Sequence, residues 1–301
     1  MAAEVRFPVM GTQAHVIVTA DPSLAERLTA FAAHELSLME RRWSRFLPTS
    51  ELSRLNGAAG KPVVVSADTF SVIKSAVDAW EQTGGCFDPT VHDALCATGY
   101  DRTFAEIPEQ TGRPGSASPA PGCADIELDP HLHAIRLPAG VRLDLGGIAK
   151  GAAADLIVGR VLEAGADGAC VNVGGDIRIE GRAPTSSGWI VELAFGDELH
   201  RRIKLAAGAV CTSTSTKRRW MTTDGERHHI IDPRAGRSTT GLRWVSVIAA
   251  RATQAEVLTT AVFVAGEDAG RRIIEANHCY AVIIDDNAAL TEIGCLEELA
   301  A

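Results

Sequence analysis

The sequence predicts an α+β fold. Runs of alternating polar and apolar residues, which are typical of strands, come in groups, and stretches with helical spacing separate those groups. A doubly wound parallel sheet would instead alternate single strands with single helices. The 301 residues are 46% hydrophobic and 22% charged, which is an ordinary globular composition with enough length to bury a substantial core.

The first part of the chain, up to residue 83, predicts strands followed by helices. The predicted elements of this part are strands over 5–19, a helix over 22–43, a helical turn over 50–56 and a helix over 66–83. Asp21 followed by Pro22 is the expected start of the first long helix, because the aspartate can accept a backbone N–H and proline fits the first helical position. The glycine pair at 84–85 ends the second long helix.

Residues 105–122 are unusually rich in proline, glycine and serine. We interpret this segment as a surface loop of a single unit covering 1–301, since the apolar segments on both sides look incomplete alone. The elements predicted after it are strands over 134–137, 141–145, 168–173, 177–180, 189–195, 202–205, 209–212, 244–249 and 279–285, with helices over 149–162 and 253–265.

Charge and apolar runs exclude some classes of function. The formal net charge is -9, and the only basic block is Lys217-Arg218-Arg219, so we expect no nucleic-acid partner. No stretch reaches the ~18 apolar residues of a spanning helix. The N-terminus lacks a basic segment followed by an apolar one, which predicts a cytoplasmic protein or a chain whose export segment has been removed.

Two glycines and a lysine follow an apolar run in RLDLGGIAKGAAADLI, residues 142–157. Gly146 and Gly147 would let the backbone approach another group, and the helix expected after them offers unpaired N–H groups and a partial positive charge. Such a junction suits a phosphate, with Lys150 beside it. The spacing is not that of a Rossmann site. Alone, the motif is more typical of a tight turn with close helix packing.

A second glycine pair, Gly174-Gly175, interrupts an apolar strand just before Asp176. The pair could form a β-bulge or a hairpin. It could also mark another place where the backbone approaches a ligand. Because both diglycine sites have an acid nearby, together they favour the ligand interpretation.

Two polar segments follow. Residues 212–216 carry five hydroxyls in a row, which could be a polar strand edge or donors to a phosphate. The sequence HHIIDPRAGRS, residues 228–238, gathers two histidines, an acid and turn residues. A lone histidine is usually a surface or turn residue, but this density favours a site.

A carboxylate and a hydroxyl share one face of the helix predicted over 253–265. Glu256 and Thr260 are four residues apart, so they lie one above the other. Such a pair can bind a hard cation through oxygen. A solvent-exposed glutamate and a packed threonine would give the same pattern.

In this order the five stretches resemble the FAD:protein FMN transferase family, also called the ApbE family. MGT at 10–12, SELSRLN at 50–56 and GCFDPTV at 85–91 add to the match, which runs from residue 10 to about residue 266. The number and order of these motifs make the resemblance specific. It implies an α+β, T-fold-like unit of two similar halves, each with helices on an antiparallel sheet, and an FAD cleft between them.

The resemblance also implies an activity and a site. The family transfers the FMN part of FAD to a Ser or Thr hydroxyl of an acceptor protein, releases AMP and requires Mg²⁺. The implied metal ligands are Glu256, Thr260 and the backbone carbonyl of Ala149. The residues implied to line the FAD site are Met10, Asp88, Asp144, Gly146, Gly147, Lys150, Gly174, Gly175, Asp176, Thr212, Ser213, Thr214, His229, Ile230 and Asp232.

Glu256 departs from the family, which usually has aspartate there. The extra methylene is expected to weaken or move the ion, because Mg²⁺ demands near-octahedral geometry at ~2.1 Å. His229 is our candidate for positioning or proton transfer, since its unperturbed pKa of ~6.5 suits that role. We expect Asp144 to order its turn. Two alternatives remain open: an FAD-storing protein without turnover, and an FAD pyrophosphatase that gives FMN and AMP.

Overall fold

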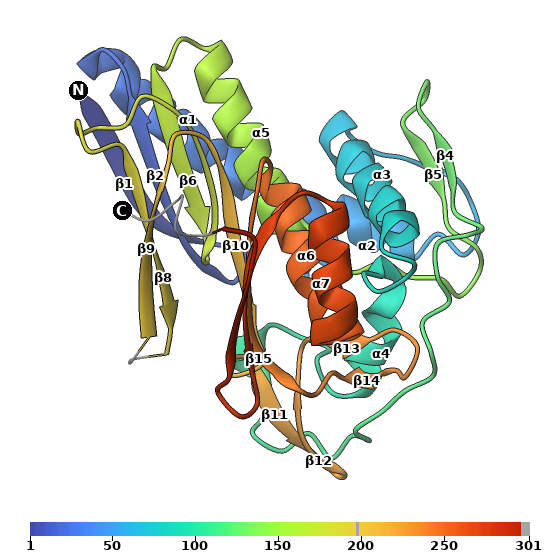
Figure 1. Cartoon of the computed structure of the whole chain (residues 1–301). Helices are drawn as coiled ribbons and strands as arrows, with labels where there is room; N and C mark the ends of the chain where they lie inside the picture. The colour runs from blue at the N-terminus through green and yellow to red at the C-terminus, as the bar shows by residue number, and fades with distance from the viewer. Residues whose placement is uncertain (197–198, 296–301) are drawn as a thin grey trace.

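The computed structural model describes residues 1–196 and 199–295. Its centre is an eight-stranded antiparallel sheet with the order β1-β2-β6-β7-β10-β15-β16-β17 (Figure 1). The strands are β1 (Ala2–Val9), β2 (Thr12–Thr19), β6 (Gly168–Val173), β7 (Asp176–Gly181), β10 (Gly208–Thr214), β15 (Leu242–Ala249), β16 (Tyr280–Asp285) and β17 (Leu290–Ile293).

Four helices cover one face of this sheet, as Figure 1 shows. They are α1 (Pro22–Trp43), α5 (Ala149–Glu163), α6 (Ala252–Ala265) and α7 (Glu267–Ala276). The main hydrophobic core lies between these helices and the sheet. A hairpin of β8 (Trp189–Phe195) and β9 (Leu199–Leu205) covers part of the opposite face and closes a second apolar cluster.

The large sheet is built from two similar halves. The order hairpin, helix, helix, hairpin appears first as β1-β2, α1, α5 and β6-β7, and again as β10-β15, α6, α7 and β16-β17. The halves join where β7 pairs with β10, with Ile177 opposite Val210. The similar halves expected from the sequence are therefore present, and each has helices on an antiparallel sheet.

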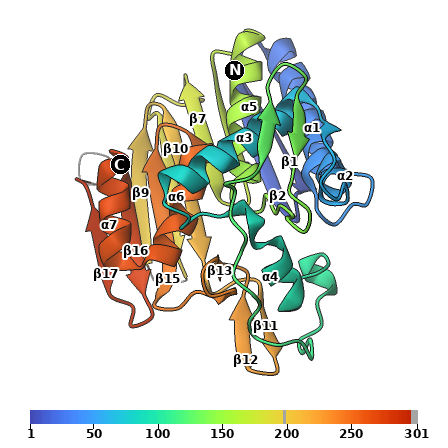
Figure 2. The same ribbon diagram turned by 90° about the vertical axis from the view of Figure 1, so that its right-hand side faces the viewer.

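Each half carries an insertion. The first, between α1 and α5, contains α2 (Glu51–Asn56), β3 (Val63–Val64), α3 (Ala67–Gln82), η1 (Pro89–Val91), α4 (His92–Ala97), η2 (Phe104–Glu106), β4 (Glu127–Asp129) and β5 (Ala134–Arg136). The second, between β10 and β15, contains β11 (Arg219–Thr222), β12 (Gly225–His228), β13 (Ile231–Asp232) and β14 (Arg237–Ser238). Figure 2 shows α3 outside the helix layer and the β11-β12 hairpin below it.

The segment 105–122 links the two insertions. Ala117 donates its N–H to the carbonyl of Gly236 at 2.8 Å, and Ala120 donates to that of Pro233 at 2.7 Å. Except for the end of η2, the segment has no helix or named strand, and most of it is exposed. Among the described residues, no helix is both long and apolar enough to cross a membrane.

Several elements differ from the sequence prediction, and for two of them the structure gives the reason. Residues 141–145 were predicted as a strand but form an extended coil, because the side chain of Asn56 replaces a partner strand. Its Oδ1 accepts the N–H of Leu143, and its Nδ2 donates to the carbonyl of Leu143, both at 2.8 Å. Helix α7 was not predicted. It is short and charged and buries only Gly270 and Ile274, so few apolar positions mark it in the sequence.

Candidate active site

Three charged side chains meet where the two halves join. The ammonium of Lys150, on the first turn of α5, contacts Asp176 at the start of β7 and Glu256 on the second turn of α6. We call these three residues the Lys150 cluster. The two carboxylate side chains are only 4% and 3% exposed, and Oε2 of Glu256 accepts the N–H of Gly151 at 2.7 Å. The cluster therefore ties α5, α6 and the sheet together.

The charges of the Lys150 cluster act on one another. Burial works to lower the pKa of Lys150, but the two carboxylates outweigh it and raise that pKa above its usual range. Burial is the main cause that raises the pKa of Glu256 to about 7, against the effect of the ammonium. The cluster places two carboxyl groups around one ammonium in a buried place, where acidic oxygens outnumber the cations. The cluster would therefore stabilise an added cation.

The glycine loop before α5 brings the backbone close to α6. A methyl group at Gly147 would lie 3.3 Å from Oγ1 of Thr260 and 3.2 Å from the ring of Phe87. Gly146 donates its N–H to Oδ1 of Asp144 at 2.6 Å. The absence of side chains at the two glycines thus lets this loop pass directly beside the helix that carries Glu256.

Asp144 is held in place by bonds to Arg45 and to the carbonyl of Pro89. Its Oδ2 lies 2.5 Å from Nε of Arg45, and both side chains are largely buried. Its N–H donates to the carbonyl of Pro89 at 2.7 Å. These bonds support the expectation that Asp144 orders the glycine turn.

Two hairpin turns lie side by side at the end of the sheet that carries Asp176. Met10 and Gly11 connect β1 to β2 with φ of 53° and 67°, and Gly174 and Gly175 connect β6 to β7 with φ of 66° and 101°. Gly174 donates its N–H to a carbonyl of β2 at 3.0 Å. Because glycine adopts positive φ without steric cost, this turn can place the start of β7 immediately after it.

The hydroxyls at the end of β10 point to different sides of the sheet. Oγ of Ser213 lies 2.7 Å from Oγ1 of Thr259 on α6, so it faces the helix layer. Oγ1 of Thr212 lies 2.7 Å from Oγ of Ser246, and Thr214 donates to a carbonyl of β15 at 2.8 Å. Of the three predicted residues, Ser213 is the one directed toward the helices.

His229 has an unused ring nitrogen. Its Nδ1 is shielded from solvent and has no hydrogen-bond partner among the residues that the structure describes. Burial is the main cause that lowers the pKa of His229 well below its ordinary value, and the positive charges of Arg218 and Lys150 add to it. The imidazole is therefore neutral near pH 7. A neutral ring with a free nitrogen can accept a hydrogen bond or a proton from a ligand.

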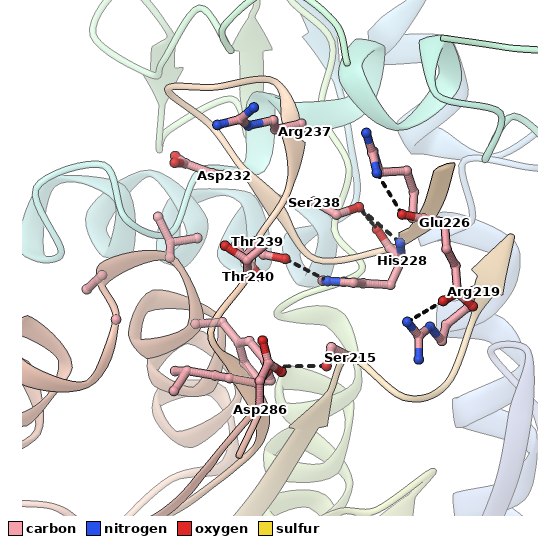
Figure 3. Close-up of a pocket in the computed structure, with 16 residues that line it drawn as sticks. Ser215, Arg219, Glu226, His228, Asp232, Arg237, Ser238, Thr239, Thr240 and Asp286 are labelled. Carbon is pink, nitrogen blue, oxygen red and sulfur yellow. Dashed lines mark hydrogen bonds and ion pairs between the residues drawn. The ribbon is translucent and has the colours of Figure 1, made fainter. Parts of the chain in front are cut away.

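A cavity of about 550 Å³ lies beside residues 228–239, at the C-terminal end of α6 (Figure 3). His228 is in its wall, where Nε2 donates to the carbonyl of Thr239 at 2.9 Å and Nδ1 accepts the N–H of Ile230 at 3.3 Å. Both ring nitrogens are engaged, and burial lowers the pKa of His228. Of the adjacent histidines, His228 thus holds the segment and His229 has a nitrogen left for a ligand.

Two predicted carboxylates are bonded within local turns. Oδ1 of Asp88 accepts the N–H of Thr90 at 2.8 Å and its hydroxyl at 2.6 Å, and burial raises the pKa of Asp88. Oδ1 of Asp232 accepts the N–H of Arg234 at 3.0 Å. Within the described part of the chain, neither carboxylate contacts the Lys150 cluster. Their part in FAD binding stays a prediction.

The implied metal ligands come from α5 and α6. Glu256 is buried, Thr260 lies one turn further along α6 and faces Gly147, and Ala149 is the first residue of α5. Across 1–196 and 199–295, no group of three or more His, Cys, Asp and Glu side chains is placed to hold a metal. The implied set contains a single acid, with a hydroxyl and a carbonyl, so it stays a prediction.

Comparison with known proteins now identifies the family. A sequence profile described as the ApbE family matches residues 10–284, nearly the whole chain. The chain belongs to the ApbE family. This confirms the resemblance drawn from the glycine motifs, the hydroxyl run and the histidine segment.

Other ApbE proteins support this membership. A protein of Rhodobacter capsulatus named FAD:protein FMN transferase is 30% identical in an alignment 279 residues long, which covers 89% of this chain and 52% of that protein. The chain thus spans about half the length of that relative. One of Treponema pallidum with the same name is 32% identical in an alignment 271 residues long, which covers 81% of this chain and 71% of the relative. The crystal structure of the ApbE protein from Thermotoga maritima matches over the full length of both chains with a TM-score of 0.87 and 26% identity, which confirms the α+β fold.

Sequence reasoning missed several residues that shape this ApbE site. Glu40 accepts the N–H of Met10 at 2.7 Å, Arg45 pairs with Asp144, and Asn56 holds Leu143. All three lie on or near helices whose apolar spacing predicted only which residues are buried and which are exposed. Asn56 ends the SELSRLN motif, which was the one available signal for its role.

Proposed function

We propose that this chain transfers the FMN part of FAD to a Ser or Thr hydroxyl of an acceptor protein, with Mg²⁺ required and AMP released. Family membership and the names of the relatives support flavin transfer. The observation that carries the proposal is the Lys150 cluster, where one ammonium and two buried carboxylates lie beside a glycine loop and a helix N-terminus. This combination suits a pyrophosphate together with a hard cation.

In this proposal the pyrophosphate of FAD binds at the N-terminal end of α5. The helix dipole favours an anion at this end of the helix. Lys150 adds a full positive charge on the first turn. Gly147 carries no side chain, so the backbone in front of the helix lies directly beside Thr260, one of the implied metal ligands.

The donor set fits Mg²⁺. The ion prefers oxygen ligands, and the Glu256 carboxylate, the Thr260 hydroxyl and the Ala149 carbonyl all offer oxygen. The excess of carboxyl groups over cations in the Lys150 cluster also favours a cation. When bound there, Mg²⁺ would neutralise charge on the pyrophosphate and on the departing AMP.

His229 supplies the proton acceptor in this scheme. The oxygen of the acceptor hydroxyl forms a bond to the FMN phosphorus, while the bond from that phosphorus to the AMP oxygen breaks. The hydroxyl proton passes to the imidazole, which is neutral because burial lowers the pKa of His229. Water in place of the hydroxyl would give FMN and AMP.

Mass spectrometry tests the reaction directly. The protein is incubated with FAD, Mg²⁺ and a protein extract, and acceptor peptides are searched for a gain of FMN less one water. We expect a modified Ser or Thr and one AMP for each modified site. Omitting Mg²⁺ and replacing the chain by its Glu256→Gln variant are the controls.

The same experiment separates the alternatives. AMP and free FMN without any modified peptide would show a pyrophosphatase. Yellow protein that retains intact FAD, with no AMP, would show a storage protein. Either result would overturn the proposed transfer.

A further inference from the structure

Helix α6, which carries Glu256 and Thr260, lacks a cap of its own. Its N-cap residue is Arg251, whose side chain makes no capping hydrogen bond, and the first turn of α6 contains no acid. The first N–H groups of a helix have no partner inside the helix, so they need one from outside. The partner found here comes from α5.

Asp155 of α5 caps α6 from across the helix interface. Its Oδ1 accepts the N–H of Ala252 at 3.0 Å, and its Oδ2 accepts the N–H of Thr253 at 2.9 Å and its hydroxyl at 2.7 Å. The Asp155 side chain is 4% exposed. A buried carboxylate at a helix N-terminus also interacts favourably with the helix dipole.

The Asp155 carboxylate is itself fixed by two arginines. Nε of Arg178 lies 3.1 Å from Oδ1, and Nε of Arg251 lies 3.5 Å from Oδ2. Arg178 is on β7, two residues after Asp176, and its Nη1 donates to the carbonyl of Gly208 at 3.2 Å. Asp155 therefore connects α5, α6 and the β7-β10 junction, which are the same elements that supply the Lys150 cluster.

Close packing makes this connection rigid. A methyl group at Gly151 would overlap the carbonyl oxygen of Ala252, so α5 and the start of α6 touch with no space between them. One turn further along α5, Asp155 bonds the same residue, Ala252. Two adjacent contacts fix the register of α6 on α5, and Glu256 follows Ala252 by four residues.

We propose that Asp155 is a positioning residue of the metal site: by capping α6 it sets where Glu256 and Thr260 lie relative to Lys150 and Asp176. Asp155 does not contact the substrate in this account, and it acts through the position of α6. The inference rests on the proposed function for the identity of the ligand, and on the geometry alone for the position of the helix.

The test compares Asp155→Ala with Asp21→Ala. Asp21 is a matched control, because it is also an aspartate N-cap, accepting the N–H of Ser23 at 3.2 Å on α1. Three quantities are measured: the Kd for Mn²⁺ by electron paramagnetic resonance, the Kd for FAD without metal, and amide hydrogen exchange. Asp155→Asn, which keeps one acceptor oxygen and the side-chain size, replaces the alanine variant if that variant does not fold.

For Asp155→Ala we expect the Mn²⁺ Kd to rise about 10- to 100-fold, the range found for outer-shell partners of metal ligands. The FAD Kd should change less than about threefold, and exchange should quicken at Ala252, Thr253 and the Gly151 amide that donates to Glu256. Asp155→Asn should give a smaller shift in the same direction. Asp21→Ala should leave the Mn²⁺ Kd and these amides unchanged.

Two results would overturn the proposal. A folded Asp155→Ala variant with unchanged exchange at these amides would show that α6 does not depend on the cap. Equal losses of Mn²⁺ and FAD affinity would show general loosening in place of metal-site positioning. Failure of the proposed function is distinguishable: a wild-type chain that transfers no FMN leaves the exchange result standing.

Discussion

The two halves of the sheet follow one plan and supply different chemistry. In the first half, the site residues come from element ends: Lys150 lies on the first turn of α5 and Asp176 begins β7. In the second half they come from inside a helix, because Glu256 and Thr260 lie along α6. The first half thus offers an ammonium and a carboxylate, and the second offers a carboxylate and a hydroxyl on one helix face.

The difference follows from where each helix begins relative to the junction. The glycine loop lies at the junction, so α5 starts there, and the N–H of Gly151 on its first turn donates to Glu256 of the other half. Helix α6 starts one turn earlier and passes the junction with its side chains, and it is buried on nearly all sides. A charge on such a helix must be paired, and Glu256 is paired with Lys150. Two halves with the same backbone arrangement can therefore place opposite charges next to each other where they join.

The largest effect is expected from removing the cation of the first half. Lys150→Met leaves two buried carboxylates without a counter-charge, which should lower the free energy of unfolding by about 3–5 kcal/mol in a chelator-containing buffer. Adding Mg²⁺ should raise the Tm of this variant more than that of the wild type. Lys74→Met is the control, because Lys74 pairs with Asp78 at 2.6 Å on the exposed surface, and it should cost less than about 1 kcal/mol.

Removing the charge of the second half should act on turnover more than on folding. Glu256→Gln keeps an oxygen that can accept the N–H of Gly151, but it loses the carboxylate. Mg²⁺-dependent AMP release should fall on the order of 100- to 1,000-fold, as for other lost electrostatic stabilisers. Glu275→Gln on the exposed side of α7 should stay within about twofold. Unchanged AMP release by Glu256→Gln would remove Glu256 from the metal site.

The contact between the halves can be loosened by one methyl group. Gly151→Ala would place its Cβ against the carbonyl of Ala252, so chemical denaturation should show a loss of about 1–3 kcal/mol. Gly159, also in α5, has open space around it, and Gly159→Ala should stabilise by about 0.5–1 kcal/mol. Equal effects of the two substitutions would mean that α5 and α6 do not meet closely at Gly151.

The smallest effect concerns the pH dependence of His229. Burial lowers the pKa of His229 well below 6.5, so its neutral form is already present at pH 6.5 and the transfer rate should change less than about twofold above that pH. Saturating Mg²⁺ is needed, because burial raises the pKa of Glu256 to about 7 and its proton would compete with the ion. An acid limb centred at or above pH 6.5 that disappears in His229→Gln would contradict this assignment.

The fold was largely predictable because its helices and strands carry strong patterns. The cap at Asp21, the helix bearing Glu256 and the strand predicted over 279–285 are found where the sequence indicates. The extended segment over 141–145 was wrong as a strand, because an apolar alternation does not reveal that a side chain, Asn56, takes the place of a neighbouring strand.

The candidate site was predictable as residue types, and less so as contacts. The motifs indicated Lys150, Asp176 and Glu256 separately, yet their contact joins residues up to 106 positions apart. The roles of Arg45 and Asp155 had no local signal, because each acts on a partner far away in the sequence. Such contacts depend on the packing of α5 against α6, which no single segment encodes.

The account rests on one cation site shared by both halves of the sheet. The most direct test is a crystal structure of the protein soaked with Mn²⁺ and FAD, with the ion located by its anomalous scattering. We predict one ion bound to Glu256, Thr260 and the carbonyl of Ala149, next to the pyrophosphate. An ion bound away from α6, or a pyrophosphate remote from the start of α5, would contradict the account.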